Sequence, residues 1–397
     1  MLPYNVDRRH LIRGSMALGG IGLLGLSSPG FSKPRNGGLA RAHRPLVPIR
    51  ARPDRVFNTT VCLRPFREAG PRIEAEQIGD TLVIHNYGHG ASGWSLSWGS
   101  ANLALQKALA NSPTHIAVIG CGVIGLTSAI MAQRAGAQVT IYARDLLPQT
   151  RSSRAQAFWG PGGAGGVKDV VAPGYVDQME QMARFSFRTF VQYGGFPGMP
   201  VEWRDQYALS DTPFDEGGGA SEASEEPEFA NYGSRLTDLT PRPVDLANDS
   251  NPFPVKFARR SESMVFNIPE FSHLLMRDFY TAGGRFVRKV FHTPNDLTEL
   301  PEKTVINCPG YEARQWWRDT TITPRRGQIS WLVPQSEVDY GLNYKGVLVT
   351  SRRDSIGVQG HFGGDWNNSS ELPDRSETDR SIAILAELFS RFRIQRS

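Results

Sequence analysis

HIAVIGCGVIGLTSAIMAQRAGAQVTIYARD, residues 115–145, decides the fold of this 397-residue chain. The pattern predicts a short apolar strand, a glycine-rich turn, an amphipathic helix and a second strand over residues 138–142. The glycines have the G-x-G-x-x-G spacing, which allows a tight turn, close approach of the backbone to a pyrophosphate, and close packing of helix on strand. The helix N-terminus then presents free N–H groups to the anion. The pattern therefore predicts a dinucleotide-binding unit whose contacts are Gly120, Gly122, Val123, Ile124 and Gly125.

The residues after the second strand leave the dinucleotide open. An acid is expected there, but Ala143 and Arg144 come first and Asp145 follows. An arginine at this place favours a 2′-phosphate and hence NADP. The next stretch, LLPQTRSSRAQAFWGPGGAGG (146–166), instead offers the hydroxyls, guanidinium and amides that a second phosphate contact and an isoalloxazine ring require. An ordinary polar loop is the alternative. The expected cofactor contacts here are Arg144, Asp145, Thr150, Arg151 and Ser152.

Charge is unevenly distributed along the chain. The net charge of +5 comes from residues 1–50, which hold eight Lys/Arg and one acid and leave 36 basic and 38 acidic residues elsewhere. A body without excess positive charge argues against nucleic acid as the main partner. Three widely spaced cysteines offer neither a disulfide framework nor a metal site. The acidic, Gly/Ser-rich stretch between Ser210 and Phe229 is predicted to be a mobile insertion.

Residues 1–42 have the pattern of an export signal followed by a linker. Arg8-Arg9 precedes a weakly apolar, uncharged stretch, 15–31, and then a Gly/Pro/Arg-rich spacer. This order predicts a twin-arginine signal, and hence contact with the twin-arginine export machinery, a periplasmic or secreted protein and a tightly held cofactor. A disordered basic tail is the alternative. The apolar stretch is too short and too rich in Gly and Ser for a transmembrane helix, so no integral membrane protein is expected.

Motifs along the chain resemble the D-amino acid oxidase family of flavoenzymes. GVIGL, IYARDLLP and the Thr/Ser-rich run resemble the start of the family's chains. VINCPG (305–310) is similar to its strand near the flavin, RGQI (326–329) to its return into the substrate sheet, and GHFGGDW (360–366) to a following strand and turn. The resemblance implies FAD and an α/β fold, with a Rossmann-like FAD-binding domain beside an antiparallel substrate sheet. The FAD-binding domain is expected mainly in 56–170 and 286–330, and the substrate domain mainly in 171–285 and 331–393.

One segment resembles the end of the family's chains but precedes the nucleotide-binding strand. It is CLRPFREAGPRIEAEQIGDTLVIHNYGHGASGWSLSWGSA, residues 62–101, and a predicted helix over 99–110 runs from it into that strand. The chain itself stops after a helical stretch ending near Phe392. This order predicts a circular permutation, which is tolerated where termini lie close together at the surface. Residues near 56 and 393 are therefore expected to be neighbours.

The resemblance assigns this segment two parts of a site. Arg64, within Leu-Arg-Pro, matches the arginine that binds the substrate carboxylate, a task that suits the parallel N–H donors of a guanidinium. For an arginine taken alone, a solvated surface role is the alternative. His85 and His89 are expected to pack or to support other residues. Flavin contacts are expected from Gly90, Ala91, Ser92, Gly93, Trp94 and Ser95, and an adenine-side contact from Val290.

The family's second carboxylate ligand, a tyrosine, is missing. Val347 stands in its place, and Tyr340 and Tyr344, in a preceding loop (333–346) with the character of a lid, are the candidates to replace it. His361 and Trp366 either line the pocket or belong to the core.

The resemblance implies oxidative deamination of a D-amino acid. A hydride passes to the flavin, O2 reoxidises it, and the products are a 2-oxo acid, ammonia and hydrogen peroxide. Orientation, carboxylate binding and a dry pocket are what the protein supplies, so neither a metal nor a catalytic base is expected. A flavin dehydrogenase that reduces a quinone and a non-catalytic flavin-binding protein are the alternatives. The substrate side chain and the oligomeric state, a homodimer included, stay open.

Overall fold

The computed structural model describes residues 46–156, 158–161, 165–216 and 226–392. These residues belong to one compact unit. The predicted export signal, 1–42, and residues 217–225 of the predicted insertion lie outside the described ranges.

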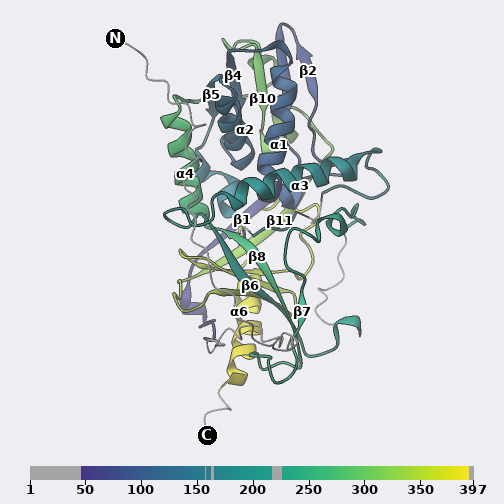
Figure 1. Cartoon of the computed structure of the whole chain (residues 1–397), viewed down its shortest axis with the longest axis vertical. Helices are drawn as coiled ribbons and strands as arrows, with labels where there is room; N and C mark the ends of the chain where they lie inside the picture. Colours follow the sequence, from purple (N-terminus) through teal and green to yellow (C-terminus); the bar gives the residue numbers. More distant parts are fainter. Residues whose placement is uncertain (1–45, 157, 162–164, 217–225, 393–397) are drawn as a thin grey trace, which may run out of the picture. The chain divides into compact units, whose positions relative to one another are not determined.

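A six-stranded sheet is built around the decisive segment (Figure 1). Helix α2 (Val123–Arg134) joins two of its strands, as predicted, and all the neighbouring strands pair in parallel except the antiparallel edge pair β2–β3. The central strands are buried along almost their whole length, as in parallel sheets covered on both faces. In order across the sheet, the strands are β2 (Ala75–Ile78), β3 (Thr81–His85), β10 (Thr304–Asn307), β4 (His115–Ile119), β5 (Gln138–Ala143) and β9 (Arg285–Arg288).

Helices α1 (Gly93–Ala108) and α3 (Tyr175–Val191) cross next to this sheet. A Cβ at Gly99 of α1 would overlap the Met182 carbonyl of α3, so the two backbones meet at the glycine. The Gly99 N–H donates to Ser186 Oγ at 2.8 Å. Helix α1 begins six residues before the predicted start, because its Trp- and Ser-rich first turns are buried in tertiary contacts that the local pattern does not show. Helices α4 (Ile268–Thr281) and α5 (Ala313–Trp316) complete this part, with α4 packed on α2.

The second sheet has eight strands and is mainly antiparallel; only β12 and β6 pair in parallel. In order across the sheet, the strands are β1 (Val56–Arg67), β11 (Ile322–Leu332), β14 (Ile356–Gly360), β13 (Val347–Ser351), β12 (Tyr340–Tyr344), β6 (Val201–Ser210), β8 (Phe257–Phe266) and β7 (Val244–Asp245).

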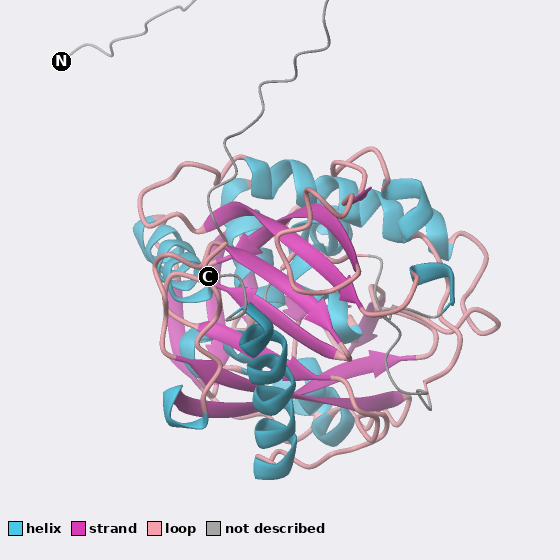
Figure 2. Ribbon diagram, turned by 90° about the horizontal axis from the view of Figure 1, so that it is seen from below, coloured by secondary structure: helices cyan, strands magenta, loops and turns pink. Residues whose placement is uncertain are grey.

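Alternate residues of this sheet face two different environments. Side chains such as Val347, Val349 and Val358 pack with α6 (Arg375–Ser390), which lies over one face of the sheet (Figure 2). We call this group of buried residues the α6 cluster. The residues between them, such as Leu348 and Gln359, point to the opposite face, because successive side chains of a strand alternate.

Two sequence expectations differ from this arrangement. β1 and β11, inside the ranges expected to form the FAD-binding domain, pair with each other in the eight-stranded sheet. The expected lid loop, 333–346, contains strand β12, which is held on both sides by β6 and β13. The β1–β11 and β6–β12 pairings join strands far apart in sequence, whereas β12 and β13 form a hairpin through Lys345 and Gly346.

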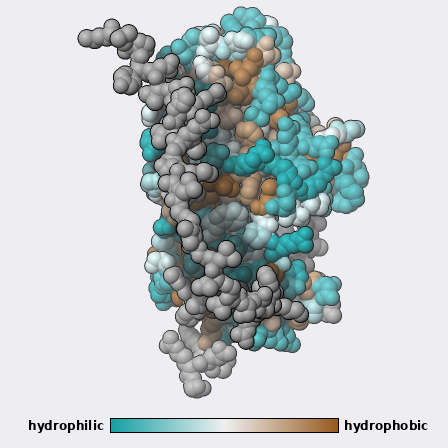
Figure 3. Space-filling view, in the orientation of Figure 1, coloured by the Kyte–Doolittle hydropathy of each residue, from teal (hydrophilic) through white to brown (hydrophobic). Residues whose placement is uncertain are grey.

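The visible surface shows few hydrophobic areas. Hydrophilic side chains cover most of the coloured face in Figure 3, and the hydrophobic areas between them are small. In the described part of the chain, none of the helices combines the length and the apolar character needed to cross a bilayer.

Candidate active site

A cavity of about 790 Å³ is lined by residues of both sheets. At one end lie the β4–α2 turn and the end of β5, and at the other lie β1, β11 and β14. Among the described residues, no cluster of His, Cys, Asp and Glu is arranged to hold a metal ion. The three cysteines are free thiols.

The β4–α2 turn forms a cradle of backbone at one end of the cavity. Gly120 has a φ of +90°, and a Cβ there would overlap the carbonyl oxygen of Cys308. A Cβ at Gly125 would overlap the carbonyl oxygen of Gly120. The Val123 N–H donates to Ser152 Oγ at 3.0 Å, and no side chain caps the helix at Gly122. The first turn of α2 thus presents backbone to the cavity, which fits a pyrophosphate.

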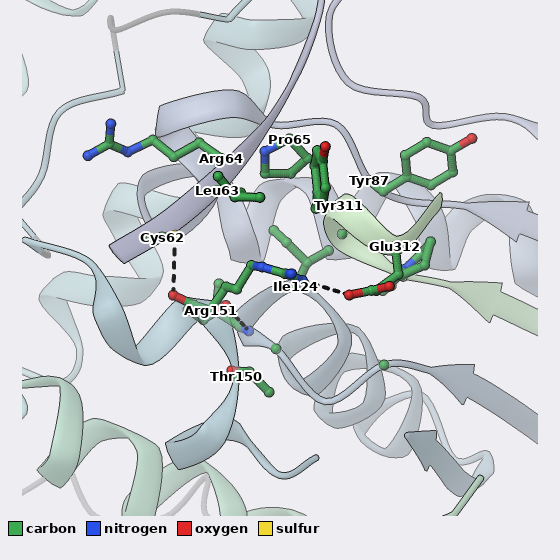
Figure 4. Close-up of a pocket in the computed structure, with 18 of the residues that line it drawn as sticks. Cys62, Leu63, Arg64, Pro65, Tyr87, Ile124, Thr150, Arg151, Tyr311 and Glu312 are labelled. Carbon is green, nitrogen blue, oxygen red and sulfur yellow. Dashed lines mark hydrogen bonds and ion pairs between the residues drawn. The ribbon is translucent and has the colours of Figure 1, made fainter. Parts of the chain in front are cut away.

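A network of charged side chains lies beside this cradle (Figure 4). Arg151 bonds Glu312 at 2.8 Å and binds Glu371 through two N–H groups, at 2.8 and 3.0 Å. Burial lowers the pKa of Arg151, but its hydrogen bonds to Glu371 and Glu312 outweigh this effect and the pKa is raised. Arg144 pairs with Asp145 at 2.7 Å. Each of these two arginines is therefore neutralised within the protein.

The loop before α1 contacts the same cavity. Trp94 Nε1 donates to the carbonyl oxygen of Ser152 at 2.8 Å, and Ser95 Oγ accepts from the Gly160 N–H at 3.0 Å. Gly88 and Gly90 have φ of +87° and +54°, a region that favours glycine. The contacts of Trp94 and Ser95 hold the first turn of α1 against the segment that follows β5.

His85, at the end of β3, and His89, in the loop before α1, are buried and hydrogen-bonded. His89 Nε2 lies 2.6 Å from Ser100 Oγ, and Ser100 donates to Asn86. His89 must therefore be the donor to Ser100, which makes Nε2 the protonated ring nitrogen. Burial lowers the pKa of His89 to about 3. His85 bonds Glu76 at 2.9 Å, and burial lowers its pKa to about 4.

Arg64 lies at the other end of the cavity. In Figure 4 its side chain extends away from Arg151 and Glu312. Its Nη1 donates to the Arg326 carbonyl at 3.2 Å, and its guanidinium occupies the space over Gly327, where a Cβ would overlap it. Burial lowers the pKa of Arg64, and the charge of Arg325 lowers it further.

Six lysine and arginine side chains line the cavity, and five of them have an ion-pair partner. Arg325, directly opposite Arg64 in the β1–β11 ladder, pairs with Glu226 through two bonds of 2.5 and 2.9 Å. Within the described ranges, no carboxylate lies at ion-pair distance from Arg64. Arg64 is thus the one of these six side chains without a direct ion pair in the described ranges, although the charges of Asp365 and Glu226 act on it from a greater distance.

The structure brings together nearly all the predicted cofactor residues. Each of them lines the cavity except Ser92. Ser92 is fully buried and donates from Oγ to the Pro161 carbonyl at 3.3 Å, because the 3₁₀ turn Gly90–Ser92 directs its side chain away from the cavity. A contact between the flavin and the backbone amide of Ser92 stays a prediction.

The two candidate tyrosines lie in the α6 cluster, not in the cavity. Tyr340 donates to the Val47 carbonyl at 2.8 Å, and Tyr344 donates to Asp211 at 2.7 Å. Both face α6 because they occupy alternate positions of β12. The prediction that one of them binds the substrate carboxylate is wrong on this placement. Val347 faces the same cluster, and Leu348 is the β13 residue that borders the cavity.

Several cavity residues were not singled out from the sequence. The alternation of side chains along β13 and β14 is the sequence signal that could have pointed to two of them, Leu348 and Gln359. The ion pairs of Arg151 and Arg325 join residues 99 or more positions apart, for which one sequence carries no signal. His361 does line the cavity, whereas Trp366 packs against Phe66. The cavity residues that the sequence analysis missed include Gln156, Glu312, Arg325, Leu348, Gln359 and Glu371.

Comparisons with known proteins agree with this geometry. Residues 115–397 match the family described as FAD dependent oxidoreductase (DAO). D-amino-acid oxidase of Dictyostelium discoideum is 21% identical over 304 residues, which cover 71% of this chain and 75% of that protein. D-aspartate oxidase of Cryptococcus neoformans var. grubii is 46% identical over 52 residues, 13% of each chain. Iminodiacetate oxidase of Chelativorans sp. BNC1 superposes with a TM-score of 0.51 at 13% identity, over 70% of this chain and 79% of that one, which shows a shared fold.

Proposed function

Because this chain belongs to the FAD dependent oxidoreductase family, we propose that it oxidises a D-amino acid to a 2-oxo acid, releasing ammonia and reducing O2 to hydrogen peroxide. FAD, when bound, accepts a hydride from the α-carbon and is reoxidised by O2, and water hydrolyses the resulting imine. The β4–α2 cradle would hold the pyrophosphate. The loop over residues 88–95 would lie against the flavin.

Arg64 carries the proposal. A partly buried guanidinium without a counter-ion is unfavourable, so its place in the cavity indicates a ligand of opposite charge. A carboxylate has the two oxygens that match the fork of a guanidinium, and this bidentate contact fixes the α-carbon in space. An α-amino acid supplies that carboxylate next to the carbon to be oxidised.

His361, which lines the same cavity, adds no positive charge beside Arg64. Burial, and then the charges of Arg64 and Arg325, lower the pKa of His361 to about 4, so the imidazole is neutral at pH 7. A substrate whose amino group arrives neutral needs no further base from the protein.

The test is anaerobic reduction of the purified flavoprotein by D- and L-amino acids, added singly, followed by admission of air. Loss of the oxidised flavin band with D-amino acids, and its rapid return with peroxide, is the expected result. Slow return in air with rapid return on adding a quinone would favour a dehydrogenase. A flavin that no amino acid reduces would contradict the proposal.

Substitution of Arg64 tests the carboxylate contact directly. Arg64→Ala should lower kcat/KM by on the order of 10³-fold, since one partner of a desolvated charge pair is lost, while FAD stays bound. Arg64→Lys keeps the charge but loses the fork and should recover only part of this loss. Turnover that persists in Arg64→Ala would remove the carboxylate assignment.

The order of the chain supports a circular permutation. The family match begins at residue 115, at strand β4, whereas β1, β3 and α1 precede it. β1 completes one sheet by pairing with β11, and β3 completes the other by pairing with β10. Val56 and Phe392 pack against the same α6 cluster, as neighbouring original ends would.

Export by the twin-arginine route remains a proposal that rests on Arg8-Arg9 and the apolar stretch after them. Changing Arg8 and Arg9 together to lysine should retain the flavoprotein in the cytoplasm of a bacterial host. Equal export of the lysine variant would contradict it.

A further inference from the structure

The cavity-facing side of the eight-stranded sheet holds buried polar groups without partners. In the β13–β14 ladder, Leu348 lies opposite Gln359 and Thr350 lies opposite Gly357, so all four face that side. Gln359 Nε2, Thr350 Oγ1 and Gln156 Oε1 are buried and have no hydrogen-bond partner. Buried polar side chains are nearly always bonded, so such a group of exceptions indicates a ligand.

Gln359 is the centre of this group. Its residue is only 1% exposed, it lines the cavity, and its side chain makes no hydrogen bond with the described residues. Both halves of its amide are therefore available to a molecule in the cavity.

Gln156 stands beside it with a defined orientation. Its Nε2 donates to the Leu348 carbonyl at 3.4 Å, which leaves Oε1 as a free acceptor. Gly357 makes room for this oxygen, since a Cβ there would lie 2.9 Å from it. Gln156 is 6% exposed and also lines the cavity. The two glutamines thus offer a donor and an acceptor on either side of Leu348.

The charges around these groups favour a neutral ligand. Arg325 is paired with Glu226, and Arg352, the buried arginine next along the same face, bonds Asp354 at 2.8 Å. Nε and Nη1 of Arg352 are buried without a partner, but Arg352 does not line the cavity. Among the cations that line the cavity, Arg64 is the one left for a carboxylate. A second carboxylate on the substrate would have no free positive charge to meet, whereas a carboxamide matches a free donor and a free acceptor.

Gln156, Gln359 and Leu348, which together we call the amide subsite, lie within reach of a substrate held at Arg64. The guanidinium of Arg64 lies over Gly327 of β11, and Ile329, two residues further along β11, packs at Gly357, where Gln156 Oε1 also lies. Two residues of a strand span about 6.8 Å. A short side chain that leaves the α-carbon of a substrate at Arg64 can bridge such a distance.

We infer that Gln156 and Gln359 bind a side-chain carboxamide of the substrate, with Gln359 Nε2 donating to its oxygen and Gln156 Oε1 accepting from its N–H. Leu348 then packs against the aliphatic stem. The inference rests on the proposed function, because it takes the α-carboxylate to be bound by Arg64. It makes the two glutamines specificity-determining residues that select D-asparagine or D-glutamine.

The experiment compares anaerobic reduction of the FAD-bound enzyme by D-asparagine, D-glutamine, D-leucine, D-aspartate and D-alanine. D-leucine has the shape of D-asparagine without its polar groups, and D-alanine has no side chain to reach the subsite. At least one carboxamide should give a kcat/KM about 10- to 100-fold above those of D-leucine and D-aspartate. With D-leucine both glutamine amides would stay without a hydrogen bond, and with D-aspartate the acceptor of Gln156 would.

Gln359→Leu should remove this preference while changing kcat/KM for D-alanine by less than about threefold. The substitution keeps side-chain volume and deletes unsatisfied polar atoms, so folding and flavin content should be retained. Gln156→Leu is a second variant that should also remove the preference, and in addition it deletes the hydrogen bond to the Leu348 carbonyl. Gln206→Leu is the matched control, because Gln206 Nε2 is also unpartnered but does not line the cavity, and it should leave the preference unchanged.

The outcomes separate the inference from the proposed function. Reduction by D-alanine without a preference for a carboxamide would overturn the inference alone. An equal loss with every substrate in Gln359→Leu, D-alanine included, would mean that the amide binds the α-carboxylate, and this also overturns it. Reduction by none of the D-amino acids would contradict the proposed function itself.

Discussion

Gly125 is the residue at which the dinucleotide turn has least space. A Cβ there would overlap the backbone carbonyl of Gly120, which cannot move without opening the β4–α2 turn. At Gly122 the nearest atom to a Cβ is a side-chain oxygen, Ser152 Oγ, at 3.0 Å. We expect Gly125→Ala to lose most of its FAD and to unfold at a lower temperature, and Gly122→Ala to lose less of both. Flavin absorbance per protein and thermal unfolding measure the two effects, and equal losses would contradict this account.

Single residues also show where sequence reasoning stops. The glycines of the dinucleotide motif and Arg64 could be found because their roles depend on local spacing or on a short motif. Tyr340, Tyr344 and Gln359 could not be sorted in that way, because only the pleat decides which of them faces the cavity. One residue of register separates Val347, in the α6 cluster, from Leu348, at the site.

At the scale of elements, the crossing of α1 and α3 depends on Gly99. Gly99→Ala should push the helices apart and lower the free energy of unfolding by about 1–3 kcal/mol, although alanine favours helix more than glycine does. Gln106→Ala, on the exposed side of α1, is the control and should change it by less than about 0.5 kcal/mol. Urea unfolding of both variants measures the difference. A stabilised Gly99→Ala would show that helix propensity dominates at this crossing.

The elements predicted best are those with a local period. Strand β4, helix α2 and strand β5 follow from apolar spacing within 31 residues. A local period is also visible in helix α3, which buries Tyr175, Met179, Met182, Ser186 and Phe190 along one side, the spacing of an amphipathic helix. Strand β12 was expected to be a loop because its partner β6 lies over a hundred residues away, and that pairing leaves no local trace.

For the whole molecule, three buried histidines predict how stability depends on pH. Burial lowers the pKa of His89 to about 3 and those of His85 and His361 to about 4, from 6.5. Between pH 6.5 and 5 the unfolded chain binds protons that the folded protein does not, so the free energy of unfolding falls as pH falls. Each histidine contributes up to about 1.4 kcal/mol per pH unit.

Urea unfolding at pH 7, 6 and 5 tests this dependence. His361→Gln should reduce the slope by about one third, since it removes one of the three groups. An unchanged slope in that variant would show that His361 is protonated in the folded protein in this range.

The proposed permutation predicts that the chain can be reordered. A gene encoding residues 113–392, a short Gly/Ser linker and then residues 46–111 should give a folded protein that binds FAD, because Val56 and Phe392 pack on one cluster and the break falls in an exposed turn. Flavin content and the melting temperature check it. A chain opened instead inside β10, a buried central strand, should not fold.

Along β13 and β14, neighbouring residues alternate between packing against α6 and facing the side of the sheet that borders the cavity. Val347, Val349 and Val358 pack against α6, while Leu348 and Gln359 line the cavity and Thr350 lies on the same side of the sheet as they do. A change at one of the second set alters what the cavity recognises and leaves the first set in place. Mutation and selection can therefore retune substrate preference along this hairpin, one alternate position at a time, with little loss of stability.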